Sequence, residues 1–157
     1  MKISTFLILS ALFWLIEKLV YVLLGIPYFI FYQWIIFSLI ALPATRGFVS
    51  AALTAALIAD IFSGFTFGLG FISILAVFGL ILIIKKLINI DRKPLYFFLS
   101  SLLFTAVFYL LLGYLAGANS VFGRLPMIIY CWIVSSVVII LFTKLAKIKF
   151  PWPGFTR

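Results

Sequence analysis

The residue types in this chain that could do chemistry are few, and the acids stand out among them. Only three of the 157 residues are acidic, namely Glu17, Asp60 and Asp91. Glu17 and Asp60 lie in strongly apolar stretches. A carboxylate in such surroundings is costly unless it is hydrogen-bonded, paired with a cation or used in function. Each of these two acids therefore calls for a physical reason.

Three explanations of Asp60 are open from the sequence. As its helix ends, the carboxylate can accept backbone N–H bonds from Ser63 and Gly64, in the manner of an Asx turn. It can pair with a cation, for which Arg124 and Lys18 are the candidates. It can also serve as a ligand or proton site.

Glu17 and Lys18 are neighbours in sequence, so their side chains point to different faces of a helix. A direct ion pair between them is a poor assumption. We expect Glu17 to face the bundle and to hydrogen-bond a neighbouring helix. Lys18 can extend its amine outward along the helix.

The sequence contains few other residues of the types that take part in catalysis. Histidine is absent, so the chain has no imidazole base or metal ligand. The single cysteine, Cys131, cannot form an internal disulfide, and the acids fall in three different segments. A nucleophile with its base, or acids around a divalent ion, is what membrane hydrolases and lipid transferases need. We expect no enzymatic activity, no cofactor and no metal.

Composition places these residues in a membrane. Hydrophobic residues make up 67% of the chain and charged residues 10%, against about 45–50% and about 25% in soluble domains. The mean hydropathy is +1.38. Continuous apolar runs favour helices over the alternating strands of a membrane barrel. The net charge of +9 does not indicate nucleic-acid binding, because the cations lie at the ends of apolar runs.

The pattern predicts one all-α membrane domain, residues 1–157, built as a bundle of six transmembrane helices. Gly25 and Pro27 break the first apolar run, and Pro43 ends the second. The helices are expected at about 3–24, 27–43, 47–62, 67–87, 95–116 and 125–143.

Basic residues predict the orientation, since cytoplasmic loops are enriched in them. With the amino terminus inside, most of the 12 basic residues fall on the cytoplasmic side. Arg124 alone lies outside, and Lys18 lies within the first span. Both termini are then cytoplasmic. The basic, aromatic segment 144–153 is either an anchor at the lipid interface or a docking site for a partner.

Small residues recur every fourth position in the third predicted helix, at Ala51, Ala55 and Ala59 and again at Ala52 and Ala56. This spacing lets two helices approach closely. We expect the third helix to be central in the bundle. Its partner helix can belong to this chain, which we favour, or to another protein.

The segment from Asp60 to Gly70 resembles a motif of the rod-shape-determining protein MreD family: an acid, then Ser63-Gly64, then Gly68 after a short apolar gap. Pro27 ahead of the second helix resembles the family's proline at that place. The chain departs from the family where an acid usually follows this proline, because Tyr28 and Phe29 stand there.

The resemblance implies a non-catalytic scaffold in the bacterial inner (cytoplasmic) membrane. Such a protein would bind MreC and link MreB filaments to peptidoglycan synthesis by RodA and its penicillin-binding transpeptidase. The implied fold is similar to the substrate-binding subunit of energy-coupling-factor transporters. A substrate-binding subunit of a vitamin uptake transporter is therefore the alternative function. The surface around Ser63–Gly70 and the exposed helix faces are the expected contacts with a partner's transmembrane helix.

Overall fold

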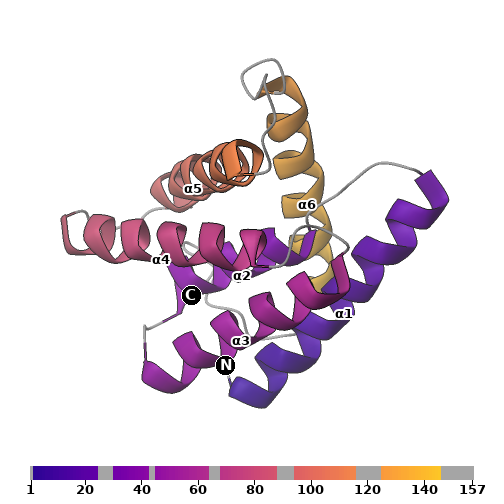
Figure 1. Ribbon diagram of the computed structural model, residues 1–157, viewed down its shortest axis with the longest axis horizontal. Helices are drawn as coiled ribbons and strands as arrows, with labels where there is room; N and C mark the ends of the chain where they lie inside the picture. Colours follow the sequence, from indigo (N-terminus) through magenta and orange to yellow (C-terminus); the bar gives the residue numbers. More distant parts are fainter. Residues whose placement is uncertain are drawn as a thin grey trace.

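A computed structural model describes residues 2–24, 30–42, 45–63, 68–87, 94–115 and 125–145. The described residues form six helices and no strand, which confirms the predicted all-α class (Figure 1). The helices are α1 (Ile3–Leu24), α2 (Ile30–Ala41), α3 (Arg46–Ser63), α4 (Leu69–Leu87), α5 (Pro94–Leu115) and α6 (Leu125–Leu145). Predicted helix positions 27–29, 43, 67 and 116 lie outside the described residues.

Four helices, α1, α4, α5 and α6, are long and apolar enough to cross a membrane. The other two are shorter. Helix α2 has 12 residues and rises only ~18 Å, whereas a hydrocarbon core is ~30 Å thick. Helix α3 has 18 residues and carries both Arg46 and Asp60.

Helix α2 is the central element of the fold, with contacts to all five other helices (Figure 1). Every residue from Ile30 to Ile40 is buried. The prediction that the third helix is central was wrong. Helix α3 packs on α1, α2 and α4 and leaves a stripe that includes Thr54 and Ile61 exposed. Small residues at four-residue spacing indicate that another helix packs closely against one face of α3. A central helix must be buried on every face.

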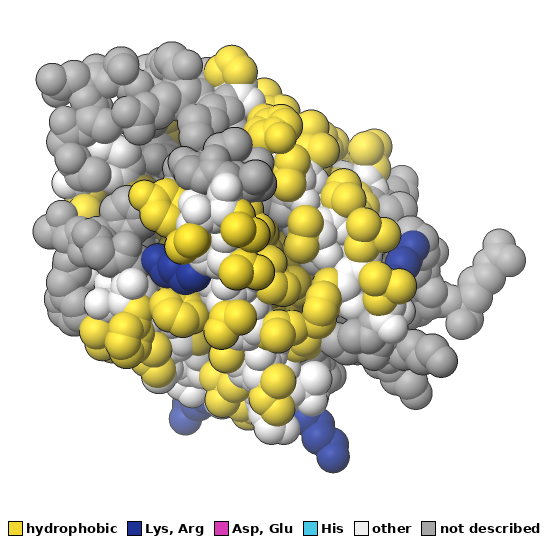
Figure 2. All heavy atoms as spheres, turned by 90° about the vertical axis from the view of Figure 1, so that its right-hand side faces the viewer, with side chains coloured by type: hydrophobic (Ala, Val, Ile, Leu, Met, Phe, Trp, Pro, Cys, Tyr) yellow, Lys and Arg dark blue, Asp and Glu magenta, His cyan; other side chains and the backbone are white. Residues whose placement is uncertain are grey.

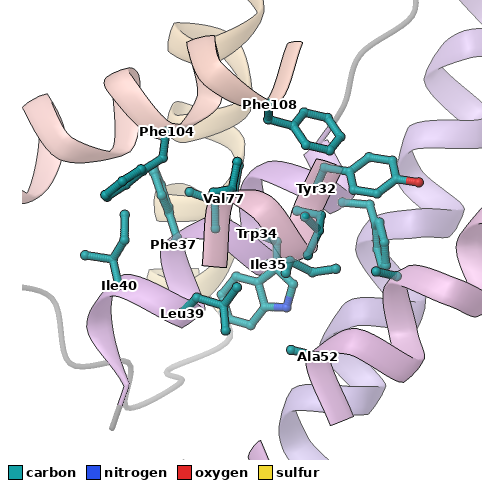
Figure 3. Close-up of a cluster of buried hydrophobic side chains, with 14 of the residues drawn as sticks. Tyr32, Trp34, Ile35, Phe37, Leu39, Ile40, Ala52, Val77, Phe104 and Phe108 are labelled. Atoms are coloured by element: carbon teal, nitrogen blue, oxygen red, sulfur yellow. The ribbon is translucent and has the colours of Figure 1, made fainter. Parts of the chain in front are cut away.

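Large side chains radiate from α2 toward its neighbours (Figure 3). Tyr32 lies against Phe108 of α5, with ring centroids 4.8 Å apart. Trp34 reaches α1, where its ring centroid lies 5.1 Å from that of Phe13. Phe37 faces α5 near its amino end and lies 5.4 Å from Phe97. The core is therefore filled by aromatic and branched side chains around one short helix.

Contacts along the helices fix their relative directions. Glu17 and Ser10 of α1 contact Phe31 and Trp34 of α2 in reverse order, so these two helices are antiparallel. Helices α1 and α3 run the same way. A Cβ built on Gly47 would lie 3.1 Å from Ile3, and the rings of Phe62 and Trp14 meet further along both helices.

One end of the bundle, which we call the Asp60 end, is where α1 and α3 finish and α2 and α4 begin. At the opposite end, Lys85 Nζ of α4 donates to the carbonyl of Leu42, just after α2, over 3.2 Å. Gly68 adopts φ 89° at the Asp60 end, directly before α4. This left-handed conformation is easy for glycine and strained for other residues.

The central place of α2 predicts a difference between two Ile→Ala substitutions. Ile36 on α2 is 0% exposed and Ile83 on α4 is 57% exposed. Ile36→Ala leaves a cavity in packed protein, so we expect it to lower the free energy of unfolding by about 2–5 kcal/mol. Ile83→Ala should change it by less than about 0.5 kcal/mol. Unfolding of the purified protein in one detergent measures both, and equal losses would contradict the central position of α2.

Candidate functional site

The strongest candidate site is a buried polar junction at the Asp60 end. Asp60 is 3% exposed, although it is an acid in an apolar bundle. Its Oδ1 accepts a hydrogen bond from the Tyr32 hydroxyl over 2.5 Å. Its Oδ2 accepts one from the backbone N–H of Phe71 over 2.7 Å. One carboxylate thus joins α2, α3 and α4, and we call Tyr32, Asp60, Gly70 and Phe71 the Asp60 junction.

Gly70 makes the junction possible. A Cβ built on it would overlap Asp60 Oδ1 and the Tyr32 hydroxyl. Gly70 is itself buried in the first turn of α4. Any side chain there would occupy the space in which the tyrosine and the carboxylate meet. The requirement for glycine at 70 is therefore one of close approach, whereas Gly68 is required for its backbone angle.

Glu17 links α1 to α2 in the way that Asp60 links α3 to α4. Its Oε2 accepts a hydrogen bond from the backbone N–H of Phe31 over 2.9 Å. Phe31 lies in the first turn of α2, as Phe71 lies in the first turn of α4. The first N–H groups of a helix have no partner within the helix, and the helix dipole favours a negative charge there. The hydrogen bond that we expected from Glu17 to a neighbouring helix is confirmed.

The explanations of Asp60 from sequence missed its partners. Ser63 ends α3, while its side chain, Gly64 and Arg124 lie outside what the structure describes. Lys18 is placed against another residue, because its Nζ lies 5.8 Å from the ring centroid of Trp14. The two partners that the structure describes for Asp60 are Tyr32 and Phe71, which the sequence did not indicate.

The alanines of α3 divide between two roles. Ala52, Ala56 and Ala59 are buried against the rest of the core, which is packing within the chain. Ala51 and Ala55 are only half-buried at the margin of that face. The buried stripe thus contains the second predicted series, Ala52 and Ala56, and only Ala59 of the first series.

Further hydrogen bonds tie the remaining helices to α2 or to each other. The Thr105 hydroxyl of α5 donates to Oε1 of Gln33 over 2.6 Å. The Trp34 indole N–H donates to Ser10 Oγ over 3.1 Å. Trp132 of α6 donates to Ser101 Oγ of α5 over 3.2 Å. Sequence reasoning did not single out Tyr32 or Gln33, although a glutamine inside an apolar run is a signal that could have been used.

These contacts define what the junction can do. Both oxygens of Asp60 are engaged with donors of the same chain. Within the described helices no three His, Cys, Asp or Glu side chains gather where a metal ion could bind. Cys131, the single cysteine of the chain, is buried on α6. The geometry of the junction is that of a structural hydrogen-bond link between α2, α3 and α4.

Comparisons of the chain with protein-family models, with curated proteins and with solved structures gave no match.

The close approach at Gly70 predicts that one added methyl group disrupts the junction. Gly70→Ala must displace Asp60 or Tyr32, and we expect a loss of about 1–3 kcal/mol in the free energy of unfolding. Gly79 of α4 is the matched control, since a Cβ there meets no atom within 4 Å. Gly79→Ala should be neutral or stabilise by up to about 1 kcal/mol. Unfolding measurements that rank the two variants the other way round would refute the assignment of Gly70.

Because Glu17 acts as a hydrogen-bond acceptor, we expect stability to depend on its side-chain oxygen more than on its negative charge. Glu17→Gln keeps an oxygen for the Phe31 N–H, so the free energy of unfolding should fall by less than about 1 kcal/mol. Glu17→Leu leaves that N–H without its acceptor, at a cost of about 1–3 kcal/mol. The same unfolding assay decides, and equal losses in both variants would show that the negative charge is what counts.

Proposed function

We propose that the chain is a non-catalytic membrane scaffold of the MreD type. In this proposal it lies in the bacterial inner membrane and binds MreC. Through MreC it links MreB filaments to RodA and its penicillin-binding transpeptidase. The support is the resemblance of residues 60–70 to the motif of that family, together with the apolar helices, four of which are long enough to cross a membrane.

The proposal depends mainly on one observation: two residues of the motif, Asp60 and Gly68, have structural roles in placing the helices. Asp60 supplies acceptors to two other helices, and Gly68 supplies a left-handed turn. These are requirements of helix placement, and they leave the carboxylate committed to internal donors. A motif that fixes helices serves a protein that works by presenting surfaces to partners. A substrate-binding subunit needs polar groups that are open to a ligand.

The proposed topology has six spans, with both termini on the cytoplasmic side. The parallel course of α1 and α3, with α2 antiparallel between them, supports alternating spans. Helix α2 is short for a span, but it is enclosed by protein on all sides. Its ends can therefore lie below the lipid surface where other helices cover them.

A partner helix has a suitable surface on α3. Ser50, Thr54 and Ile61 form an exposed stripe on the side of this helix that faces away from the core. Small and hydroxyl-bearing residues let membrane helices pack closely and bond across the interface. We place the contact with the transmembrane helix of MreC on this stripe.

Co-purification tests this proposal. Thr54→Trp adds bulk at the middle of the stripe and should lower recovery of MreC several-fold. Leu99→Trp is the control, because Leu99 is equally lipid-facing on α5 and 55% exposed. Both variants leave the Asp60 junction intact, which Asp60→Leu would not. Undiminished recovery with Thr54→Trp would refute the α3 contact. Failure of the unaltered chain to recover MreC, with binding of a vitamin-sized ligand, would favour the uptake subunit instead.

A further inference from the structure

An apolar groove runs between α1 and α3. Its volume is about 390 Å³, which is within the roughly 300–1,000 Å³ of pockets that hold small ligands. Ala11 and Trp14 of α1 and Ala55 and Phe62 of α3 line its sides, and Phe31 of α2 also contributes. Small residues on both helices leave the space open. The groove borders the Ser50–Ile61 stripe, because Ile58, which lines the groove, lies one helical turn from Thr54 and Ile61.

The described lining of the groove has few polar groups to orient a polar ligand. They are the hydroxyl of Ser10 and the indole N–H of Trp14. The Ser10 hydroxyl already donates to the Phe6 carbonyl over 2.8 Å and accepts from the Trp34 indole. A hydrocarbon chain is the chemistry that fits such a lining.

A cation lies at one end of the groove. The rings of Trp14 and Phe62 meet at a centroid distance of 5.9 Å in the last turn of α3. Lys18 is one turn further along α1, with its Nζ 5.8 Å from the Trp14 ring centroid. The ammonium therefore lies beside a ring that lines the groove, near the last turn of α3. The groove thus runs from a hydrocarbon-lined trough to a positive charge at the Asp60 end.

Of the acids that the structure describes, Glu17 is next to Lys18 in sequence, and both Glu17 and Asp60 accept hydrogen bonds from other donors. Glu17 points to the Phe31 N–H, and Asp60 is held in its junction. Figure 2 views the side that carries α1, where hydrophobic side chains surround isolated basic ones and no acidic side chain is visible. A counter-ion from outside the chain fits this arrangement.

We propose that the groove binds one acyl chain of an anionic phospholipid whose phosphate contacts Lys18. An amphiphile with a negative head and a hydrocarbon tail matches the charge at one end and the apolar lining along the rest. The lipid belongs to the leaflet at the Asp60 end. This site is independent of the proposed scaffold function.

Native mass spectrometry of the purified protein tests the site, with phosphatidylglycerol as the probe and phosphatidylcholine as the uncharged-head comparison. Ala11→Phe fills the groove from an exposed position and should reduce bound phosphatidylglycerol at least fivefold. Lys18→Gln should reduce the preference for phosphatidylglycerol about fivefold, the factor that one basic residue contributes near anionic lipid. The matched controls are Ala76→Phe on the exposed face of α4 and Lys86→Gln at the opposite end. Both should retain the lipid.

Fluorescence quenching is a second measurement, and it does not require a variant that fills the groove. Phosphatidylglycerol brominated on its acyl chain should quench tryptophan fluorescence, and most of that quenching should disappear in Trp14→Phe. Equal lipid retention in Ala11→Phe and Ala76→Phe would overturn the proposal. So would quenching that Trp14→Phe leaves unchanged, or a groove occupied by a partner's helix when the scaffold complex is purified.

Discussion

The carboxylate of Asp60 is the constraint on which the arrangement of α2, α3 and α4 depends. In an apolar interior, a polar group without a partner costs several kcal/mol. The acid therefore has to lie where donors from other helices converge, and the Tyr32 hydroxyl and the Phe71 N–H provide them. The position of Gly70 follows, because the tyrosine and the acid meet in the space that a side chain would fill. One expensive group thus fixes three helices in register.

Glu17 shows that the same solution is used twice. Water caps the first N–H groups of helices in soluble proteins, but in a membrane those groups need acceptors from protein. Each of these acids lies toward the end of one helix and accepts from the first turn of the next. Both serve α2 or α4, and α2 is the helix that contacts all the others. The scarcity of acids and their placement therefore have a common structural origin.

The sequence predicted the class, the six helices and the hydrogen bond of Glu17, because the lengths of apolar runs and the cost of burying an acid can be judged from local sequence. It did not reveal the centre of the bundle. The alanines of α3 indicate close packing on only one face of that helix. The burial of α2 depends on five helices that come together from distant parts of the chain. Tyr32 is one of seven tyrosines, and nothing local distinguishes it. Its role exists only once α3 and α4 converge on it.

Helix α3 has three surfaces with different consequences. Its buried alanines pack on the core and carry Asp60 into its junction. Its half-buried Ala55 faces the groove beside α1, where Lys18 adds a charge. Its outward stripe of Ser50, Thr54 and Ile61 is exposed. The junction holds the helix from the inside, which leaves the groove and the stripe, the surfaces proposed for a lipid and for a protein, on its outer side. A rigid attachment at Asp60 is what allows a short helix to present both.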